Sequence, residues 1–399
     1  MKTSTQPNRI IIVGGVAGGA SAAAKARRVD ENAEIHVFER GPFISFANCG
    51  LPYYIAGEID DRAKLIIMTP EKFWTRSRIH AHVNHEVISI NRTAKTIQVK
   101  GPDGSTRDVA YDKLILSQGA KPIVPPIPGV QLPHVFTLRD IPDMDRIEKF
   151  MDEQKPKRAV VIGGGFIGME MAEAFHHRGM HVTVVELSPH ILPLLDHDMA
   201  TNLEKQTRRD DFNFKTGTGA TAFTRKGIEF ADGSKLAADL ILLSVGVKAE
   251  VELAKSAGLE IGVTGGVKTN GRMESSDPDI YAVGDAAETM HALTGARARI
   301  ALAGPANRQG RIAGANAAGA KLTYPGALGT SIVRVLNMTI GFTGLNSAQA
   351  TKAGFSFFTS LTRDHIQPRR IRLCSTASSK PHQIRETSCS IVSPVRAQH

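Results

Sequence analysis

The chain has 399 residues, of which 42% are hydrophobic and 22% charged, so it is long enough for two or three domains and too apolar for a disordered or fibrous protein. Its net charge of +10 is divided equally between residues 1–354 and the much shorter segment 355–399, so the main body is only mildly basic. A mildly basic body disfavours a nucleic-acid-binding protein and suits a substrate that carries phosphates. Three cysteines are too few for a secreted disulfide scaffold and predict a cytoplasmic location, and without any run of 18 apolar residues no membrane span is expected.

The first predicted unit is a strand at 9–13, a glycine-rich turn at 14–19, a helix at 20–28 and a strand at 34–38 that ends at Glu39. Its glycines fall at turn spacing, which favours a strand, turn and helix over a signal peptide. The turn contains Gly14, Gly15, Gly18 and Gly19, but Val16 replaces the usual middle glycine. With Glu39 as the ribose-binding acid, this unit predicts a nucleotide site.

The same pattern returns later in the chain, with a strand at 158–162, a helix at 169–178 and a strand at 181–185 that ends at Glu186. In its turn, Gly163 permits the tight bend, Gly165 lets a pyrophosphate approach, and Gly168 lets helix and strand pack closely. Glu186 would accept hydrogen bonds from the ribose hydroxyls and would repel a 2′-phosphate, which favours NADH over NADPH. Two dinucleotide units in one chain suggest FAD in one and a nicotinamide cofactor in the other.

The remaining predicted elements complete these two units and begin a third. Strands at 114–116 and 240–243 close the two sheets, and a proline-rich linker at 122–128 separates them. Gly284 and Asp285 follow another strand, where a turn can hold the ribityl chain and phosphate of FAD. A helix around 306–311 and a strand at 331–336 come next, whereas residues 355–399 contain no glycine and lose hydrophobic periodicity, which predicts a disordered or out-of-frame segment.

Cys49 is the only cysteine in the first 373 residues and lies in the stretch Ser45-Phe46-Ala47-Asn48-Cys49-Gly50-Leu51-Pro52-Tyr53. A dithiol centre with four intervening residues would need a second cysteine at position 44 or 54, where the chain has Ile44 and Tyr54. The pattern therefore predicts chemistry with a single sulfur, whose disulfide partner lies outside this stretch.

Metal binding is not expected. Three groups of residues are candidates for ligands, but none has cysteines nearby or the spacing of a two-histidine, one-carboxylate site. A solvated face explains each of them better: His80, His82 and His85; His176 and His177; and Asp196, His197 and Asp198.

Over about residues 8–354 these motifs resemble the single-cysteine branch of the FAD-dependent pyridine nucleotide-disulfide oxidoreductases, above all the coenzyme A-disulfide reductases and the related NADH oxidases, NADH peroxidases and persulfide reductases. The resemblance rests on residues 45–54, 279–285 and 306–311. It implies an α/β fold with two Rossmann-like domains of the glutathione-reductase type. The FAD-binding domain is expected at 1–120 and 250–325, and the NAD(P)H-binding domain at 121–249. An incomplete α+β dimerisation domain is expected to start at 326–354, followed by an aberrant tail at 355–399. The incomplete domain puts the family's homodimer in question.

The resemblance also implies a role for each candidate residue. Cys49 would be the redox nucleophile, Gly14 to Gly19 with Glu39, Gly284 and Asp285 would hold FAD, and Gly163 to Gly168 with Glu186 would hold the nicotinamide cofactor, which Glu170 would face. Positions that contact coenzyme A are matched by Ser21, Lys25, Arg28, Ser45, Asn48, Lys72 and Asn307. Lys25, Arg28 and Lys72 suit the phosphates of coenzyme A, although surface cations would look the same.

The implied activity passes electrons from NAD(P)H through FAD to Cys49, which reduces coenzyme A disulfide or a related small disulfide and contributes to redox homeostasis. Two alternatives remain open: an NADH oxidase or peroxidase that uses a sulfenic acid at Cys49, and a truncated flavin-binding protein without catalytic activity.

Overall fold

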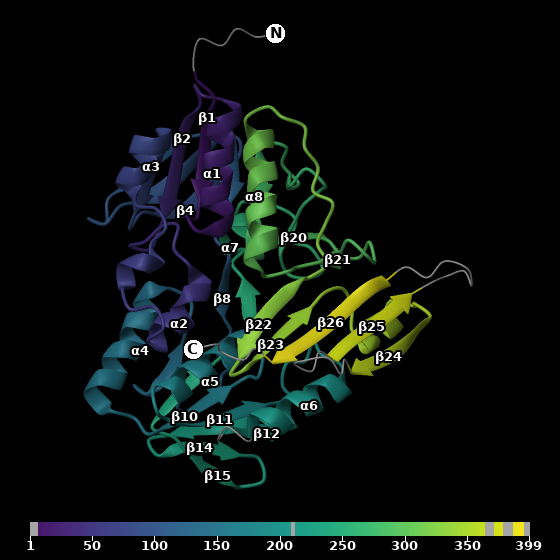
Figure 1. Ribbon diagram of the computed structural model, residues 1–399. Helices are drawn as coiled ribbons and strands as arrows, with labels where there is room; N and C mark the ends of the chain where they lie inside the picture. Colours follow the sequence, from purple (N-terminus) through teal and green to yellow (C-terminus); the bar gives the residue numbers. More distant parts are fainter. Residues whose placement is uncertain (1–6, 209–211, 364–370, 378–385, 395–399) are drawn as a thin grey trace. The chain divides into compact units, whose positions relative to one another are not determined.

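The computed structural model describes residues 7–208, 212–363, 371–377 and 386–394 (Figure 1). The chain forms two units, each assembled from three segments. Unit 1 contains 1–47, 63–121 and 248–327, and unit 2 contains 48–62, 122–247 and 328–399. Residues 48–62, which include Cys49, group with unit 2 rather than with the N-terminal segment, and residues from 328 on also belong to unit 2.

Unit 1 is built on a parallel sheet with the strand order β19-β7-β1-β2-β3. Its central strand β1 reads Arg-Ile-Ile-Ile-Val, and the three isoleucines are fully buried, as expected for a parallel strand covered on both faces. The strands are β1 (Arg9–Val13), β2 (Glu34–Glu39), β3 (His80–Val83), β7 (Lys113–Leu116) and β19 (Ile280–Ala282), and the helices are α1 (Ala17–Val29), α3 (Pro70–Ser77), α7 (Glu252–Ser256) and α8 (Ala303–Ala317).

Two small sheets complete unit 1. One is the antiparallel sheet β4 (Glu86–Asn91), β5 (Thr96–Lys100) and β6 (Thr106–Ala110), and the other contains β18 (Val267–Lys268), β20 (Ala287–Met290) and β21 (Arg297–Ala298). A 3₁₀ turn, η4 (Gly284–Ala286), follows β19, and the short elements η2 (Arg62–Leu65), β8 (Ala120–Pro122) and β17 (Val247–Ala249) lie where the chain passes between units.

Helices α1 and α8 lie side by side in Figure 1 because glycines remove the side chains between them. A Cβ atom added at Gly310 would lie 2.2 Å from the carbonyl oxygen of Gly18, and one added at Gly314 would lie 2.2 Å from that of Ala22. The helix backbones therefore approach too closely for any side chain at these two positions.

Unit 2 repeats the parallel arrangement with the strand order β12-β11-β10-β16-β9. Its strands are β9 (Val135–Thr137), β10 (Arg158–Ile162), β11 (His181–Glu186), β12 (Phe212–Thr216) and β16 (Leu240–Leu243), with an antiparallel sheet of β13 (Ala220–Thr224), β14 (Gly227–Phe230) and β15 (Lys235–Ala237). The helical elements are η1 (Asn48–Gly50), α2 (Leu51–Ile55), α4 (Ile141–Gln154), α5 (Phe166–His177) and α6 (His197–Thr207). In both units, a parallel strand, a glycine turn and a helix follow one another in the order expected from the sequence.

The last segment of unit 2 forms an antiparallel sheet with the order β22-β23-β26-β25-β24 and a helix α9 (Ser347–Lys352). The expected strand at 331–336 is β22 (Ser331–Val335), which pairs with β23 (Met338–Phe342). Beyond residue 355 the structure describes the backbone of β24 (Phe357–Arg363), β25 (Ile371–Ala377) and β26 (Glu386–Pro394). This differs from the expected disordered tail, because Thr, Ser and β-branched residues there satisfy their backbone groups by antiparallel pairing; residues 364–370, 378–385 and 395–399 lie outside the described part.

Among the residues that the structure describes, no helix is both long enough and apolar enough to cross a membrane.

The contact between α1 and α8 gives a testable prediction. We expect Gly310→Ala to lower the free energy of unfolding by about 1–3 kcal/mol, because the new methyl group collides with backbone rather than with a movable side chain. Gly304→Ala in the same helix is the matched control: its Cβ meets nothing within 4 Å, so it should be neutral or slightly stabilising. Denaturant unfolding midpoints compare the two, and equal midpoints would contradict the close approach.

Candidate functional site

The two glycine turns are built alike, around a carboxylate at the end of the second strand. In unit 1, Glu39 accepts hydrogen bonds from the backbone N–H groups of Gly15 and Gly41, both at 2.9 Å. In unit 2, Glu186 accepts them from Gly164 at 2.6 Å and from Ser188 at 2.7 Å. Each acid therefore fixes the loop between its strand and the helix that follows, at the edge where a nucleotide ribose binds in such units.

The outer glycines of both turns are required by sterics. Gly14 and Gly163 have φ values of +95° and +105°, and a Cβ atom at either would lie within 2.4 Å of a carbonyl oxygen of the neighbouring strand's loop. A Cβ atom at Gly19 or Gly168 would lie 1.8 or 1.9 Å from the carbonyl oxygen of the first glycine. These four positions accept only glycine without a shift of backbone.

The middle position differs between the turns. A Cβ atom at Gly165 would meet nothing within 4 Å, so this glycine leaves open space in front of the turn. In the first turn Val16 occupies that place with ordinary negative φ, and it forms the N-cap of α1. The space at Gly165 is what an approaching pyrophosphate needs, which makes the second turn the more open cradle.

Both helices that follow the turns begin without a side-chain cap. No side chain accepts a hydrogen bond at the N-cap of α1 or of α5, and neither helix has an acid in its first turn. Helices α3, α4 and α9 are instead capped by Thr69, Asp140 and Asn346. The first N–H groups of α1 and α5 are thus available to a phosphate, so both turns fit the diphosphate of a dinucleotide such as FAD or NAD(P)H.

Gly284 and Asp285 lie at the start of η4, directly after β19. Gly284 has φ +70°, and its N–H group donates to the side-chain oxygen of Gln309 at 2.7 Å. Gln309 is 2% exposed and belongs to α8. The sequence analysis did not single out Gln309, although it lies within the motif at 306–311, and a buried amide in a helix of small residues is the signal that identifies it.

The residues expected to contact coenzyme A are divided between the two units. In unit 1 the hydroxyl of Ser21 on α1 donates to the side-chain oxygen of Asn307 on α8 at 2.8 Å. Lys25 and Arg28 follow Ser21 by four and seven positions and therefore share its helix face. Lys72 lies in the first turn of α3 and is exposed.

Within the described part of the chain, Lys25, Arg28 and Lys72 form no ion pair with a carboxylate. Arg27, between the first two, is different, because its guanidinium donates to backbone carbonyls that include those of Ser77 and Ala33. Arg27 is therefore held by backbone carbonyls of the protein itself. Lys25, Arg28 and Lys72, which form no described ion pair, suit a phosphate ligand.

Ser45 and Asn48 lie on either side of the division between the units. Ser45 is buried with φ +46°, its N–H group donates to the carbonyl of Gly15, and its own carbonyl accepts from Ile67. It therefore fixes the loop against the first glycine turn. Asn48 is exposed in unit 2, and its side-chain nitrogen donates to the carbonyl of Arg139 at 3.3 Å.

Cys49 occupies η1, immediately before the short helix α2, and is exposed. Partial desolvation by neighbouring protein atoms is the main cause that raises the pKa of the thiol, and the negative charge of Glu170 raises it further. Among the described side chains, the charged group that acts on Cys49 is thus a carboxylate and not a cation.

Glu170 lies on α5 and lines a small hollow together with Tyr53 of α2 and Arg334 of β22. Burial is the main cause that raises the pKa of Glu170 to about 7, with Glu173 adding to the shift and Arg334 opposing it. This carboxyl group therefore exchanges its proton near neutral pH, in the same unit as Cys49. The sequence analysis identified Glu170 but missed Arg334, because the two come together only through folding of distant segments.

The histidine groups were expected on solvated faces, and the structure corrects this for His82. His82 is half-buried: its ring lies 3.0 Å from that of His36 between the nearest nitrogens and stacks on Phe38, and burial with neighbouring histidines lowers its pKa to about 4. His177 is exposed but lies 3.5 Å from Glu58. The sequence could not show either contact, since the partners are on other elements.

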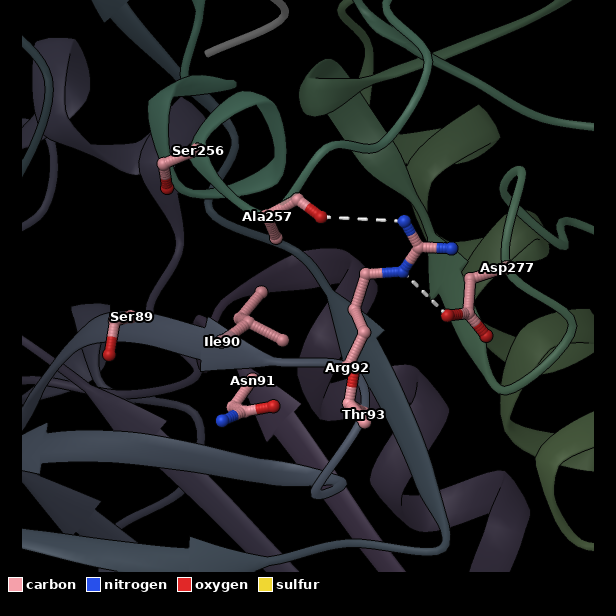
Figure 2. Close-up of a pocket in the computed structure, with 8 residues that line it drawn as sticks. All are labelled: Ser89, Ile90, Asn91, Arg92, Thr93, Ser256, Ala257 and Asp277. Carbon is pink, nitrogen blue, oxygen red and sulfur yellow. Dashed lines mark hydrogen bonds and ion pairs between the residues drawn. The ribbon is translucent and has the colours of Figure 1, made fainter.

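A larger, open hollow in unit 1 is lined by residues of β4, the following turn, the end of α7 and the loop before β19 (Figure 2). Its one charged donor, Arg92, is engaged by the Asp277 carboxylate at 2.7 Å and by the carbonyl of Ala257 at 3.4 Å. This hollow therefore presents no free charged group to a ligand, and its arginine links the hairpin to α7.

Comparisons with known proteins give consistent relatives. The chain is 36% identical over 366 residues to an NAD(P)H sulfur oxidoreductase (CoA-dependent) of Pyrococcus furiosus, covering 91% of this chain and 82% of the relative. It is 32% identical over 345 residues to a coenzyme A disulfide reductase of Staphylococcus haemolyticus, covering 86% and 78%. The water-forming NADH oxidase of Lactobacillus brevis, solved with NADH bound, matches with a TM-score of 0.89 and 28% identity over 97% of this chain and 87% of that one.

The family model of the pyridine nucleotide-disulphide oxidoreductases matches residues 8–310, which include both glycine turns, Cys49 and the Gly284-Asp285 turn. The duplicated turns and the uncapped helices agree with its two cofactors. The chain therefore belongs to the pyridine nucleotide-disulphide oxidoreductase family, and is an FAD-dependent NAD(P)H oxidoreductase with two Rossmann-like domains.

Proposed function

We propose that the protein uses NAD(P)H to reduce coenzyme A disulfide or a related small disulfide or persulfide through Cys49 alone. The observation that carries this proposal is the setting of Cys49: an exposed thiol, with no second cysteine at the spacing of a dithiol centre, in the unit that also contains the open glycine turn and Glu170. The names of the relatives from Pyrococcus and Staphylococcus support the substrate class.

The chemistry at sulfur follows from a single thiol. The thiolate of Cys49 attacks one sulfur of the substrate disulfide, a mixed disulfide forms, and the other half leaves as a thiolate. Two electrons that come from NAD(P)H then break the mixed disulfide and restore Cys49. FAD, when bound, would carry the two electrons from NAD(P)H to the sulfur.

The residues of this chain have distinct proposed parts in that reaction. We assign FAD to the turn at Gly14, Gly15, Gly18 and Gly19 with Glu39, and to Gly284 and Asp285. The nicotinamide cofactor is assigned to the turn at Gly163 to Gly168 with Glu186 and to Glu170. The unpaired cations Lys25, Arg28 and Lys72, with Ser21, Ser45, Asn48 and Asn307, are assigned to coenzyme A; a phosphate-bearing substrate is what unpaired cations favour.

An NADH oxidase or peroxidase is the second candidate, since the Lactobacillus brevis relative is an oxidase. In that case Cys49 would cycle between thiolate and sulfenic acid rather than a mixed disulfide. The adduct on Cys49 discriminates between the two reactions.

The Cys49→Ser variant tests the assignment of the sulfur. We expect it to lose NAD(P)H-dependent reduction of coenzyme A disulfide while it still binds FAD, because a hydroxyl cannot form a disulfide. The measurement is turnover of the disulfide, with the flavin absorbance as the control for folding. Turnover at the rate of the parent protein would show that another group does the chemistry, and a yellow parent protein that NADH does not reduce would favour a non-catalytic flavoprotein.

Cofactor preference is predicted by Glu186 and by Leu187, which follows it and is 76% exposed. We expect Glu186→Ala combined with Leu187→Arg to raise the NADPH/NADH ratio of kcat/KM by about tenfold or more, because it removes a carboxylate that repels a 2′-phosphate and adds a cation that binds one. Leu187→Ala alone is the control and should leave the ratio unchanged. A parent protein that already prefers NADPH would contradict the role of Glu186.

The pH dependence of thiol reactivity follows from Glu170. Because the Glu170 carboxylate raises the pKa of Cys49, we expect Glu170→Gln to lower that pKa and to speed alkylation of Cys49 by iodoacetamide several-fold at pH 8. The control is Glu148→Gln on helix α4, which removes a carboxylate that pairs with Arg178. This variant should leave the alkylation rate of Cys49 unchanged. The rate is followed by mass spectrometry of the Cys49 peptide, and an unchanged or slower rate in Glu170→Gln would contradict the coupling.

A further inference from the structure

Arg334 on β22 joins three segments of unit 2 that are far apart in the sequence. Its Nε donates to Glu173 of α5 at 2.9 Å, and its Nη2 donates to Glu58, which follows α2. The guanidinium also lies over the ring of Tyr53, with 5.2 Å from its carbon to the ring centroid. One side chain from the C-terminal segment therefore holds α5 and the stretch that begins at Cys49.

Glu173 is the centre of this arrangement. It is only 4% exposed, and its second oxygen accepts the backbone N–H group of Leu336 at 3.1 Å, so both oxygens are bound by the segment that contains β22. Removal of Arg334 would leave a buried carboxylate without its positive partner, which costs free energy of folding.

The group Glu58, Glu173 and His177 has ligand atoms within 4.8 Å of one another, which is close enough to hold a metal ion. The guanidinium of Arg334 already supplies a positive charge to both carboxylates. The cluster is therefore better explained as an ion-pair network than as a metal site.

The same network faces the groups that act on the thiol. Glu170 precedes Glu173 by three residues on α5, so both project from one helix face, and both line the small hollow with Tyr53 and Arg334. Tyr53 lies in α2, which follows directly after the turn that holds Cys49. The positive charge of Arg334 and the negative charge of Glu173 therefore have opposite effects on the pKa of Glu170.

We propose that Arg334 is a positioning residue for the thiol chemistry at Cys49: by holding Glu173 and Glu58 and covering Tyr53, it fixes the surroundings of Glu170 and supplies the one cation of the hollow. This inference deepens the proposed function and rests on Cys49 as its reactive sulfur. It gives the C-terminal segment of the chain a part in the reaction, through a residue that acts by way of Glu173, Glu58 and Tyr53.

The electrostatic signs agree with this geometry. The charge of Arg334 lowers the pKa of Glu170, whereas Glu173 raises it, and Glu170 in turn raises the pKa of Cys49. Arg334 also opposes the carboxylates that raise the pKa of Tyr53.

The other charged groups on α5 and on the strands packed against it either have partners of their own or are exposed. On β11, Glu186 is bound by two backbone N–H groups, and on β10, Arg158 pairs with Asp239 at 2.5 Å. His177 on α5 itself is exposed and lies 4.0 Å from Glu173. His181 begins β11 and is exposed. Arg334 and Glu173 are therefore the charged partners that act on Glu170.

The test is the pH profile of Cys49 alkylation by iodoacetamide in the FAD-loaded protein, read as the mass of the Cys49 peptide. Because burial raises the pKa of Glu170 to about 7, we expect a Glu170-dependent inflection near that pH in the parent protein, and we expect Arg334→Gln to move it upward by about 0.5 pH unit or more. Glu173→Gln, which keeps the shape of the side chain, should move it downward, and Arg334→Lys should restore much of the parent profile. Arg158→Gln, which breaks an ion pair at the start of β10, is the matched control and should leave the inflection in place.

The opposite directions distinguish positioning from a purely structural role, which would lower the melting temperature without moving the inflection. A folded Arg334→Gln protein with the parent profile would overturn the proposal, and so would a Glu173→Gln profile that does not move, even if Arg334→Gln fails to fold. The readout uses no disulfide substrate, so a chain that does not reduce coenzyme A disulfide would refute the proposed function and still give a result here.

Discussion

The carboxylate that ends the second strand of each parallel unit is the constraint on which the cofactor sites depend. Glu39 and Glu186 each close a glycine turn through two backbone N–H donors, so each acid sets the path of the loop that leads from strand to helix. The loop leaves the first N–H groups of α1 and α5 without a side-chain cap, and those groups are what a diphosphate binds. A change in either acid therefore affects the conformation of its glycine turn.

The two units are similar in construction and differ at the middle position of the glycine turn and in the elements added around it. The space in front of Gly165 is open, whereas Val16 occupies the corresponding place in unit 1. Unit 1 adds the Gly284 turn, bound by the buried Gln309, and the close glycine contact between α1 and α8. Unit 2 adds the thiol and a network of charges around Glu170. The two units therefore repeat one turn design, and the Cys49 thiol lies in a separate segment of unit 2.

Local sequence predicted most of the fold, because strands such as Arg9–Val13 and Arg158–Ile162 are continuous apolar runs and the glycine turns have fixed spacing. Local sequence also singled out Cys49, whereas Glu170 was named only through the family resemblance. It missed Arg334, Glu173 and Gln309, because their importance comes from partners more than 20 residues away, and a lone arginine in a strand or a glutamine in a helix has no local signal. The raised pKa of the Cys49 thiol was missed because both of its causes, desolvation and the carboxylate of Glu170 on another helix, arise only in the folded chain. His82 of β3 was misjudged because alternation alone does not reveal that His36 and Phe38 of the neighbouring strand β2 stack against it.

The most direct test of the central claim, that Cys49 acts alone on a small disulfide, is the mass of the Cys49 peptide after the protein meets coenzyme A disulfide without a reductant. The account predicts one coenzyme A joined to Cys49 by a disulfide bond and one equivalent of free coenzyme A released, with the adduct lost when NAD(P)H is added. A Cys49 peptide that stays unmodified, or that gains only oxygen, would contradict it.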